Sequence, residues 1–206
     1  MKNNKLRLLI AGDKTRFIHL KQLIAELGKI GIESKLIYDL EFIDKFFEMN
    51  IKKKIDRNKN FREILNEFNP DAVLLDRISK IGKKVIEQNI PLLILLRGNL
   101  WEESSWAKKT IYKSRIKKLA LAKNERLIDF CLKKSSIILP ISKYLENEVK
   151  KRYPEKNVEL FPADGRVPKE WYSITGQELK HPCVGLLQGL NIWGKSKELL
   201  TLKNVL

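Results

Sequence analysis

The sequence is poor in cysteine and has no long apolar run, and both shortages narrow the class of protein. Its 206 residues include only two cysteines, Cys131 and Cys183, which stand far apart in the chain. They form neither a metal-binding spacing nor a disulfide framework, so the expected location is the reducing cytoplasm. The longest apolar run, residues 91–96, is much shorter than the ~20 residues that a membrane-spanning helix needs. Any membrane contact is therefore expected to be peripheral, at the cytoplasmic face.

Acidic residues are also scarce. The chain has 41 Lys and Arg against 25 Asp and Glu, a formal net charge of +16. This excess favours partners rich in phosphate: nucleic acid, an anionic membrane surface or a phosphorylated substrate. Lysine-rich usage is also typical of some thermophilic or AT-rich sources, and this second interpretation stays open. No Asp-x-Asp metal motif occurs, so neither a metal nor a cofactor is expected.

Short apolar strands alternate with helical patterns along the whole chain. Strands are predicted at residues 6–11, 32–38, 72–75, 91–96, 137–139 and 158–161. Helices are predicted at residues 18–27, 42–47, 61–68, 78–88, much of 106–134, and 142–152 with Ser142 as N-cap. Near-continuous apolar strands alternating with helices are typical of a parallel sheet that is covered on both faces. The predicted fold class is α/β: a doubly wound, mostly parallel, Rossmann-like sheet with helices on both faces.

The end of the sequence predicts the start of a second domain. Residues 1–167 are expected to form the first domain, and residues 168–206 a linker and the first βα unit of an incomplete C-terminal domain. In that unit an apolar run is followed by Gly189, Gly194 and Lys195. Backbone N–H groups at such a helix start receive phosphate oxygens. Gly189 and Lys195 are therefore candidates for binding nucleotide phosphates.

Polar residues follow the first predicted strand, at the edge where ligands gather in an open parallel sheet. Residues 12–19 match neither the G-x-G-x-x-G fingerprint nor a phosphate-binding loop. Gly12, Asp13 and Arg16 are the candidate substrate-binding residues there. His19, in the first helical turn, is the candidate catalytic residue, as a base or a hydrogen-bond donor. Alternatively, His19 is a helix-face histidine that packs under the loop.

The richest loop is predicted after the fourth strand, at residues 97–106. It combines an arginine suited to phosphate or carboxylate, a glycine, two carboxylates, and tryptophans that can stack on a sugar. The candidate substrate-binding residues are Arg97, Gly98, Asn99, Trp101 and Glu102. A second interpretation is a helix start with Ser104 or Ser105 as N-cap and acids near it, and the two roles can coexist.

The helix predicted within residues 106–134 is strongly cationic. Between residues 108 and 134, ten Lys and Arg stand against only Glu125 and Asp129. A basic amphipathic helix can lie on anionic lipid headgroups, which predicts peripheral affinity for an anionic membrane. The alternative is a solvated helix face with no partner.

Taken together, these segments resemble the N-terminal half of GT-B glycosyltransferases, particularly the family 4 group that uses nucleotide-diphosphate sugars. The opening KLRLLIAGDKTRFIHLKQLIAELGKIGIESKLI looks like the first βαβ unit of that family. The segment SSIILPISKYLENEVKKRYPEKNVELFPADGR resembles its strand, serine, helix and strand before the interdomain linker, and HPCVGLLQGLNIWGKSKELL resembles the start of the nucleotide-sugar domain. Three features depart from the pattern, the third and most serious being an acidic motif that the 206 residues do not include. Paired glycines are absent at residues 13–16, and Leu190 replaces a frequent arginine.

The resemblance implies transfer of a sugar from a nucleotide-diphosphate sugar to a glycan or lipid-linked acceptor. It implies that Arg97, Asn99 and Glu102 position the acceptor and that His19 approaches the transferred sugar. Lys195 would stabilise the departing diphosphate, where negative charge grows. The family's acidic E-x7-E motif would lie beyond residue 206, so the 206-residue chain alone is expected to be inactive.

Two alternatives from other classes stay open. A non-catalytic flavodoxin-like module with a basic, phosphate-binding surface predicts acids after the first strand and an aspartate that ends the third. Asp76 fits this pattern, whereas Asp13 stands alone after the first strand. Direct nucleic-acid binding has only the net charge in its favour, since no helix-turn-helix, zinc or RNP pattern accompanies it. No specific nucleic-acid partner is therefore expected.

Overall fold

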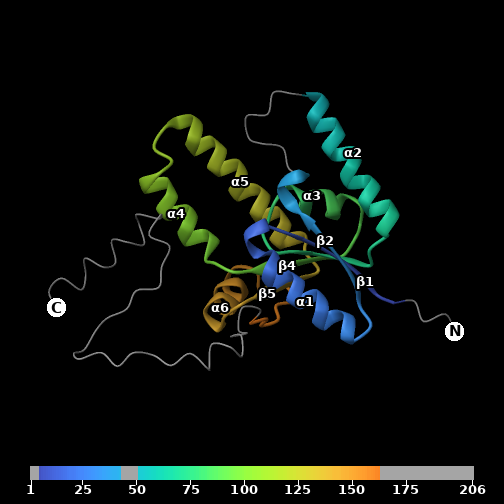
Figure 1. Ribbon diagram of the computed structural model, residues 1–206. Coiled ribbons are helices and arrows are strands. Elements are labelled where there is room, and N and C mark those ends of the chain that lie inside the picture. Colours follow the sequence, from blue (N-terminus) through green and yellow to red (C-terminus); the bar gives the residue numbers. More distant parts are fainter. Residues whose placement is uncertain (1–4, 43–50, 163–206) are drawn as a thin grey trace, which may run out of the picture. The chain divides into compact units, whose positions relative to one another are not determined.

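A computed structural model describes residues 5–42 and 51–162, which form a five-stranded sheet and its helices (Figure 1). The strands are β1 (Arg7–Gly12), β2 (Glu33–Tyr38), β3 (Ala72–Leu75), β4 (Leu92–Leu96) and β5 (Ile137–Pro140). All their pairings are parallel, and their spatial order is β2-β1-β3-β4-β5. The predicted Rossmann-like α/β fold is confirmed, with the strand order of the flavodoxin-like branch of doubly wound sheets.

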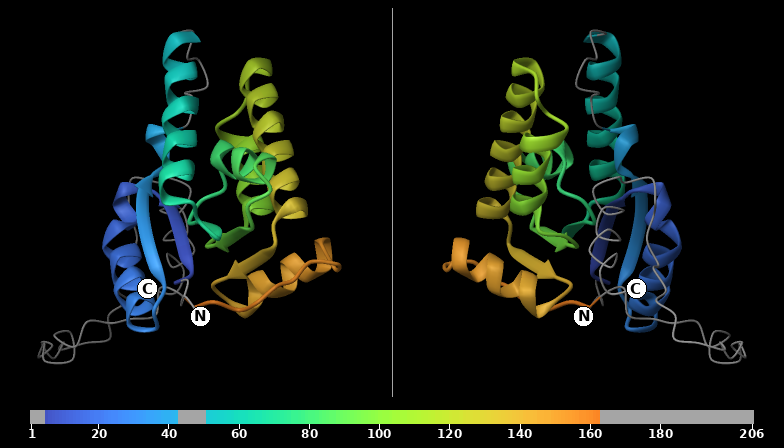
Figure 2. Two further views of the ribbon diagram at one scale, coloured as in Figure 1. Left: turned by 90° about the vertical axis from the view of Figure 1, so that its right-hand side faces the viewer. Right: turned by 90° about the vertical axis from the view of Figure 1, so that its left-hand side faces the viewer.

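Both faces of the sheet are covered, and this explains the near-continuous apolar strands. On β1, Leu8 and Ile10 face helix α1 (Phe17–Lys29), whereas Leu9 and Ala11 face the opposite layer. This alternation follows from the two-residue period of a strand. The opposite layer contains α2 (Ile51–Phe68), α3 (Lys80–Glu87) and α5 (Arg115–Lys134). Figure 2 shows α1 on one side of β1 and α3 and α5 on the other.

The two remaining helices adjoin β4 and β5. Helix α4 (Leu100–Thr110) follows β4, and α6 (Lys143–Arg152) follows β5. Ser142 caps α6 as predicted, because its hydroxyl oxygen accepts a hydrogen bond from the Leu145 N–H at 3.3 Å. Within the described ranges, no helix has both the length and the apolar content that crossing a membrane requires.

Three predicted elements differ from the structure. Helix α2 begins at residue 51, ten residues before the helix predicted at residues 61–68, and Phe61 and Leu65 anchor one side of it in the core. The long helix predicted within residues 106–134 is two helices, α4 and α5, with Ser114 as the N-cap of the second. The sixth strand is a single parallel bridge between Ile138 and Val158. Most of the helix predicted at residues 42–47 lies outside the described residues.

Candidate functional site

Charged side chains gather where strands β1 to β4 end. Asp13 follows β1, Asp39 follows β2, Asp76 and Arg77 follow β3, and Arg97 follows β4. We call these five residues the carboxyl-edge cluster. The chain passes from β1 outward to β2 and then returns to β3 on the other side of β1. Ligands of open α/β sheets bind outside the strand ends at such a switch point, so this cluster marks the candidate site.

Arg77 joins the ends of three strands. Its Nη2 donates to Oδ2 of Asp39 at 2.9 Å and to Oδ1 at 3.1 Å, and its Nη1 lies 3.3 Å from Oδ2 of Asp13. Asp39 is fully buried, whereas the Arg77 side chain is 47% exposed. Burial raises the pKa of Asp39, and the Arg77 guanidinium opposes that rise. Arg77 therefore connects the ends of three strands while about half of its side chain remains exposed to solvent.

Arg97 and Asp76 form a second ion pair beside the first. The Nε of Arg97 lies 2.5 Å from Oδ1 of Asp76, and the two side chains are only 12% and 3% exposed. Arg97 was predicted to meet an acceptor from an open loop. In the structure its guanidinium connects β4 to β3, and a role toward an acceptor stays a prediction.

Residues 12–19 begin with a close contact. Gly12 is buried, and a Cβ there would overlap the Cδ1 of Leu20 on α1. Asp13 accepts hydrogen bonds from the backbone N–H and the hydroxyl of Thr15, at 2.9 and 2.8 Å, and these bonds lower its pKa.

Arg16 and His19 are exposed at the start of α1. His19 is therefore not packed under the loop, and its catalytic role stays a prediction.

The loop predicted at residues 97–106 is mostly helix, because α4 begins at Leu100. Its N-cap is Asn99, not Ser104 or Ser105, since Asn99 Oδ1 accepts from the Glu102 N–H at 3.1 Å. Acids in the first turn stabilise a helix start, and they explain the earlier onset. Gly98 lies between β4 and α4. A Cβ added at this position would contact only the carboxylate of Glu103, the end of a flexible side chain that can move away.

The far side of the Asn99 cap holds a small polar network. Asn99 Nδ2 donates to the Tyr144 hydroxyl at 2.6 Å, and that hydroxyl donates to Glu102 Oε1 at 3.2 Å. All three side chains reach the surface, and Tyr144 is half exposed. Hydroxyl, amide and carboxylate groups of this kind bind sugar hydroxyls, so Asn99 and Glu102 keep their predicted acceptor role as a hypothesis.

Trp101 packs against α6 and its end. Its ring lies 6.2 Å from that of Tyr153, and the Arg152 guanidinium lies 4.4 Å from the centre of the indole. Trp101, Ser104, Glu125, Asp129 and Tyr153 help to line a pocket of about 190 Å³. Burial raises the pKa of Tyr153 to about 12. The predicted sugar-stacking face of Trp101 thus contacts protein groups in this structure.

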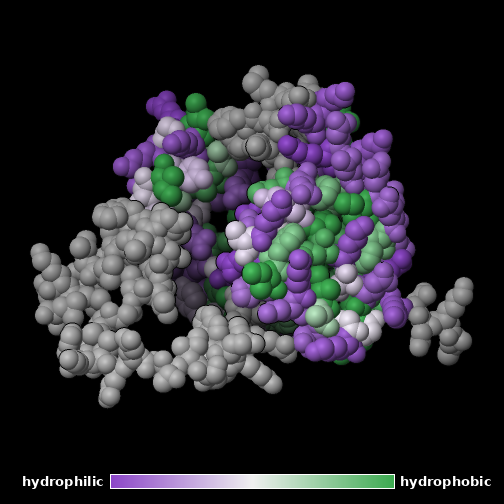
Figure 3. All heavy atoms as spheres, in the orientation of Figure 1, coloured by the Kyte–Doolittle hydropathy of each residue, from purple (hydrophilic) through white to green (hydrophobic). Residues whose placement is uncertain are grey.

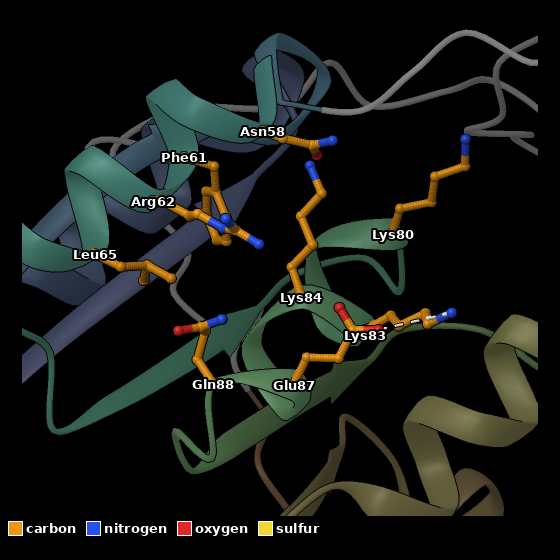
Figure 4. A pocket seen from close by; sticks show the side chains of 9 residues that line it. All are labelled: Asn58, Phe61, Arg62, Leu65, Lys80, Lys83, Lys84, Glu87 and Gln88. Atoms are coloured by element: carbon orange, nitrogen blue, oxygen red, sulfur yellow. Dashed lines mark ion pairs between the residues drawn. The ribbon is translucent and has the colours of Figure 1, made fainter. Parts of the chain in front are cut away.

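A larger pocket of about 260 Å³ lies between α2 and α3 (Figure 4). Figure 4 shows Asn58 and Arg62 of α2 and Lys84 of α3 reaching into the same gap. The Lys84 ammonium donates to the carbonyl of Phe42 at 3.0 Å and lies over the ring of Phe61. None of these residues belongs to a sequence motif that would mark it as a candidate.

Asp39, Arg77 and Tyr144 belong to no motif and are not among the residues predicted from the sequence. Asp39 and Arg77 follow predicted strands at the same edge as Asp13, and this position was the available signal. Gly189 and Lys195 lie outside the described residues. Across residues 5–42 and 51–162, no three His, Cys, Asp or Glu side chains gather as metal ligands, and independence from metal stays an expectation.

Replacing Arg77 with alanine is expected to raise the pKa of Asp39 further. At a pH below 3.8, the ordinary pKa of an aspartate, Asp39 is protonated and the loss of Arg77 changes the free energy of unfolding little. As the pH rises through the raised pKa of folded Asp39, the variant must ionise a buried carboxyl without its guanidinium partner. We expect a cost of about 2 kcal/mol at pH 7, between the values for exposed and buried pairs. Urea unfolding at pH 3 and pH 7 measures this difference, with Arg16→Ala as control. An equal cost at both pH values would contradict it.

No protein-family model matches the chain, and no curated protein matches it in sequence. A solved structure, UDP-N-acetylglucosamine 2-epimerase from Rickettsia bellii, is similar at a TM-score of 0.48 and 16% identity. The similarity covers 75% of this chain and 44% of the epimerase. The chain thus spans less than half of that protein.

Proposed function

We propose that the chain is the N-terminal, acceptor-side portion of an enzyme that transfers a sugar from a nucleotide-diphosphate sugar. The observation that carries the proposal is the carboxyl-edge cluster, which lies at the switch point of the parallel sheet. There Arg77, whose side chain is about half exposed, offers a guanidinium that is held by two carboxylates. A guanidinium so held binds phosphate or sugar oxygens with little loss of side-chain entropy. The sequence resemblance to GT-B glycosyltransferases supports the same interpretation.

In this proposal the described residues bind and orient the acceptor. Arg77 contacts an oxygen of the substrate, while the Arg97–Asp76 pair keeps the end of β4 in register with β3. His19 is exposed near the start of α1, the helix that follows β1. In this proposal its imidazole takes the proton of an acceptor hydroxyl. Asn99 and Glu102 would bind further hydroxyls.

A sequence pattern beyond the described residues points to phosphate as well. Residues 189–196, GLNIWGKS, fit the spacing G-x4-G-K-S. In loops of this spacing the backbone N–H groups and the lysine hold nucleotide phosphates. Lys195 is accordingly proposed to offset the charge of a diphosphate.

The strand order favours a second candidate, a flavodoxin-like binding module without catalysis. The order β2-β1-β3-β4-β5 is that of flavodoxin-like sheets, which bind phosphorylated ligands at the same switch point. Such a module would bind a phosphate group regardless of any sugar.

Titration of the isotope-labelled chain, followed by NMR, tests the proposal. The ligands are nucleotide-diphosphate sugars, simple glycans, inorganic pyrophosphate and a DNA duplex. Expected are shifts at the amides of residues 12–19, 39 and 77 with sugar-containing ligands, and no turnover by the chain alone. Arg77→Ala should weaken this binding about tenfold, the loss of one charge-assisted contact, and Arg62→Ala should leave it unchanged. Equal binding of pyrophosphate favours the flavodoxin-like module, and shifts away from the cluster reject both candidates.

A further inference from the structure

The turn between α4 and α5 exposes large apolar side chains. Trp106 lies in the second half of α4 and Ile111 follows its last residue, while Ile116 and Leu119 lie in the first turns of α5; their exposed fractions run from 41% to 72%. We call residues 106–119 the hairpin tip. In Figure 1 the two helices form a hairpin whose connecting turn lies away from the sheet. Figure 3 shows hydrophobic and hydrophilic spheres side by side at that end of the hairpin.

The same tip carries a dense positive charge. Residues 104–124 contain seven Lys and Arg and no Asp or Glu. Lys108 pairs with Glu125 of α5 at 2.6 Å, which leaves as candidate lipid contacts Lys109, Lys113, Arg115, Lys117, Lys118 and Lys123. Ile116 and Leu119 are three residues apart and share one face of α5, so cations flank an apolar stripe.

This combination selects one class of partner by its chemistry. Apolar side chains that are two-thirds exposed are costly in water, and the cost is recovered when they enter an apolar phase. A nucleic acid would satisfy the lysines but leave Ile116 and Leu119 in water. An anionic lipid surface can bind both kinds of side chain. Headgroup phosphates attract the cations, the aliphatic side chains insert at the boundary of the acyl chains, and tryptophan is favoured at the membrane–water interface.

We propose that the hairpin tip docks on an anionic lipid surface and inserts Trp106, Ile111, Ile116 and Leu119 at its acyl boundary. The docking is driven jointly by charge and by apolar burial, and it does not depend on the proposed sugar-transfer function. Lys123 is one turn beyond the tip on α5 and contributes to the same positive charge, whereas Lys133 and Lys134 at the other end of α5 play no part in the docking.

Vesicle co-sedimentation of the whole chain tests the proposal. The vesicles are phosphatidylcholine alone or phosphatidylcholine with phosphatidylserine. Binding is expected only with the anionic lipid and should weaken as salt rises. The double variant Ile116→Ser/Leu119→Ser should bind at least tenfold more weakly, because two aliphatic groups no longer leave water. The matched control Ile18→Ser/Ile55→Ser removes two similarly exposed apolar side chains from α1 and α2 and should bind like the wild type.

Tryptophan fluorescence gives a second readout. Vesicles should shift the emission to the blue, and Trp106→Phe should abolish most of that shift while circular dichroism stays unchanged. Insertion is overturned if the Ile116/Leu119 double variant binds as tightly as the control. It is also overturned if the chain binds a DNA duplex but no vesicle, or if neutral and anionic vesicles bind equally.

Discussion

Asp76→Ala is expected to reduce the free energy of unfolding by about 3–5 kcal/mol, because it leaves a buried guanidinium without its carboxylate. Arg97 is 12% exposed and Asp76 3%, so water cannot replace the lost charge easily. Chemical denaturation of the whole chain measures the change at pH 7.

The double variant Asp76→Leu/Arg97→Met is the decisive control. Replacing both charges with apolar groups of similar size is often neutral, so this variant should recover most of the stability lost in Asp76→Ala. A cost below about 1 kcal/mol for Asp76→Ala would mean that water already solvates the pair. Arg97 would then be available to a ligand, as the sequence analysis predicted.

Phe61→Ala should be comparably destabilising, at about 3–5 kcal/mol, because it opens a cavity in the core. Phe61 is 1% exposed and lies 5.7 Å from the ring of Phe42. It is a main anchor of α2, whose surface is otherwise largely polar. Thermal unfolding of the whole chain reports the loss.

Arg62→Ala provides the matched control, since it changes the next residue of the same helix on its exposed side. Surface substitutions of this kind stay within about 0.5 kcal/mol. If Phe61→Ala were as mild as the control, α2 would contribute little to the stability of the sheet.

Pattern alone located the sheet and most of its helices. Strands β1, β3 and β4 are short apolar runs with most residues buried, and that composition can be recognised in the sequence, whereas β2 is partly exposed and was recognised from Leu36, Ile37 and Tyr38. The prediction of one long helix was wrong because the 3.6-residue apolar period continues across the four-residue turn between α4 and α5. Only Ser114 indicates the break there. The start of α4 was missed because Asn99 and two acids, which cap a helix, were also consistent with a binding loop.

The candidate site could be predicted from the sequence less completely than the fold, because its ion pairs join residues far apart in the chain. The sequence by itself determined the fold class and the edge of the sheet where polar residues collect, because burial and strand direction follow from local pattern. Only the packed structure decided that Arg77 pairs with Asp13 and Asp39 and that Arg97 pairs with Asp76. Those choices depend on strand order and on side-chain reach between segments separated by up to 64 positions, as between Asp13 and Arg77. Charge pairing across such separations has no local signature, since it is set by which strands become neighbours.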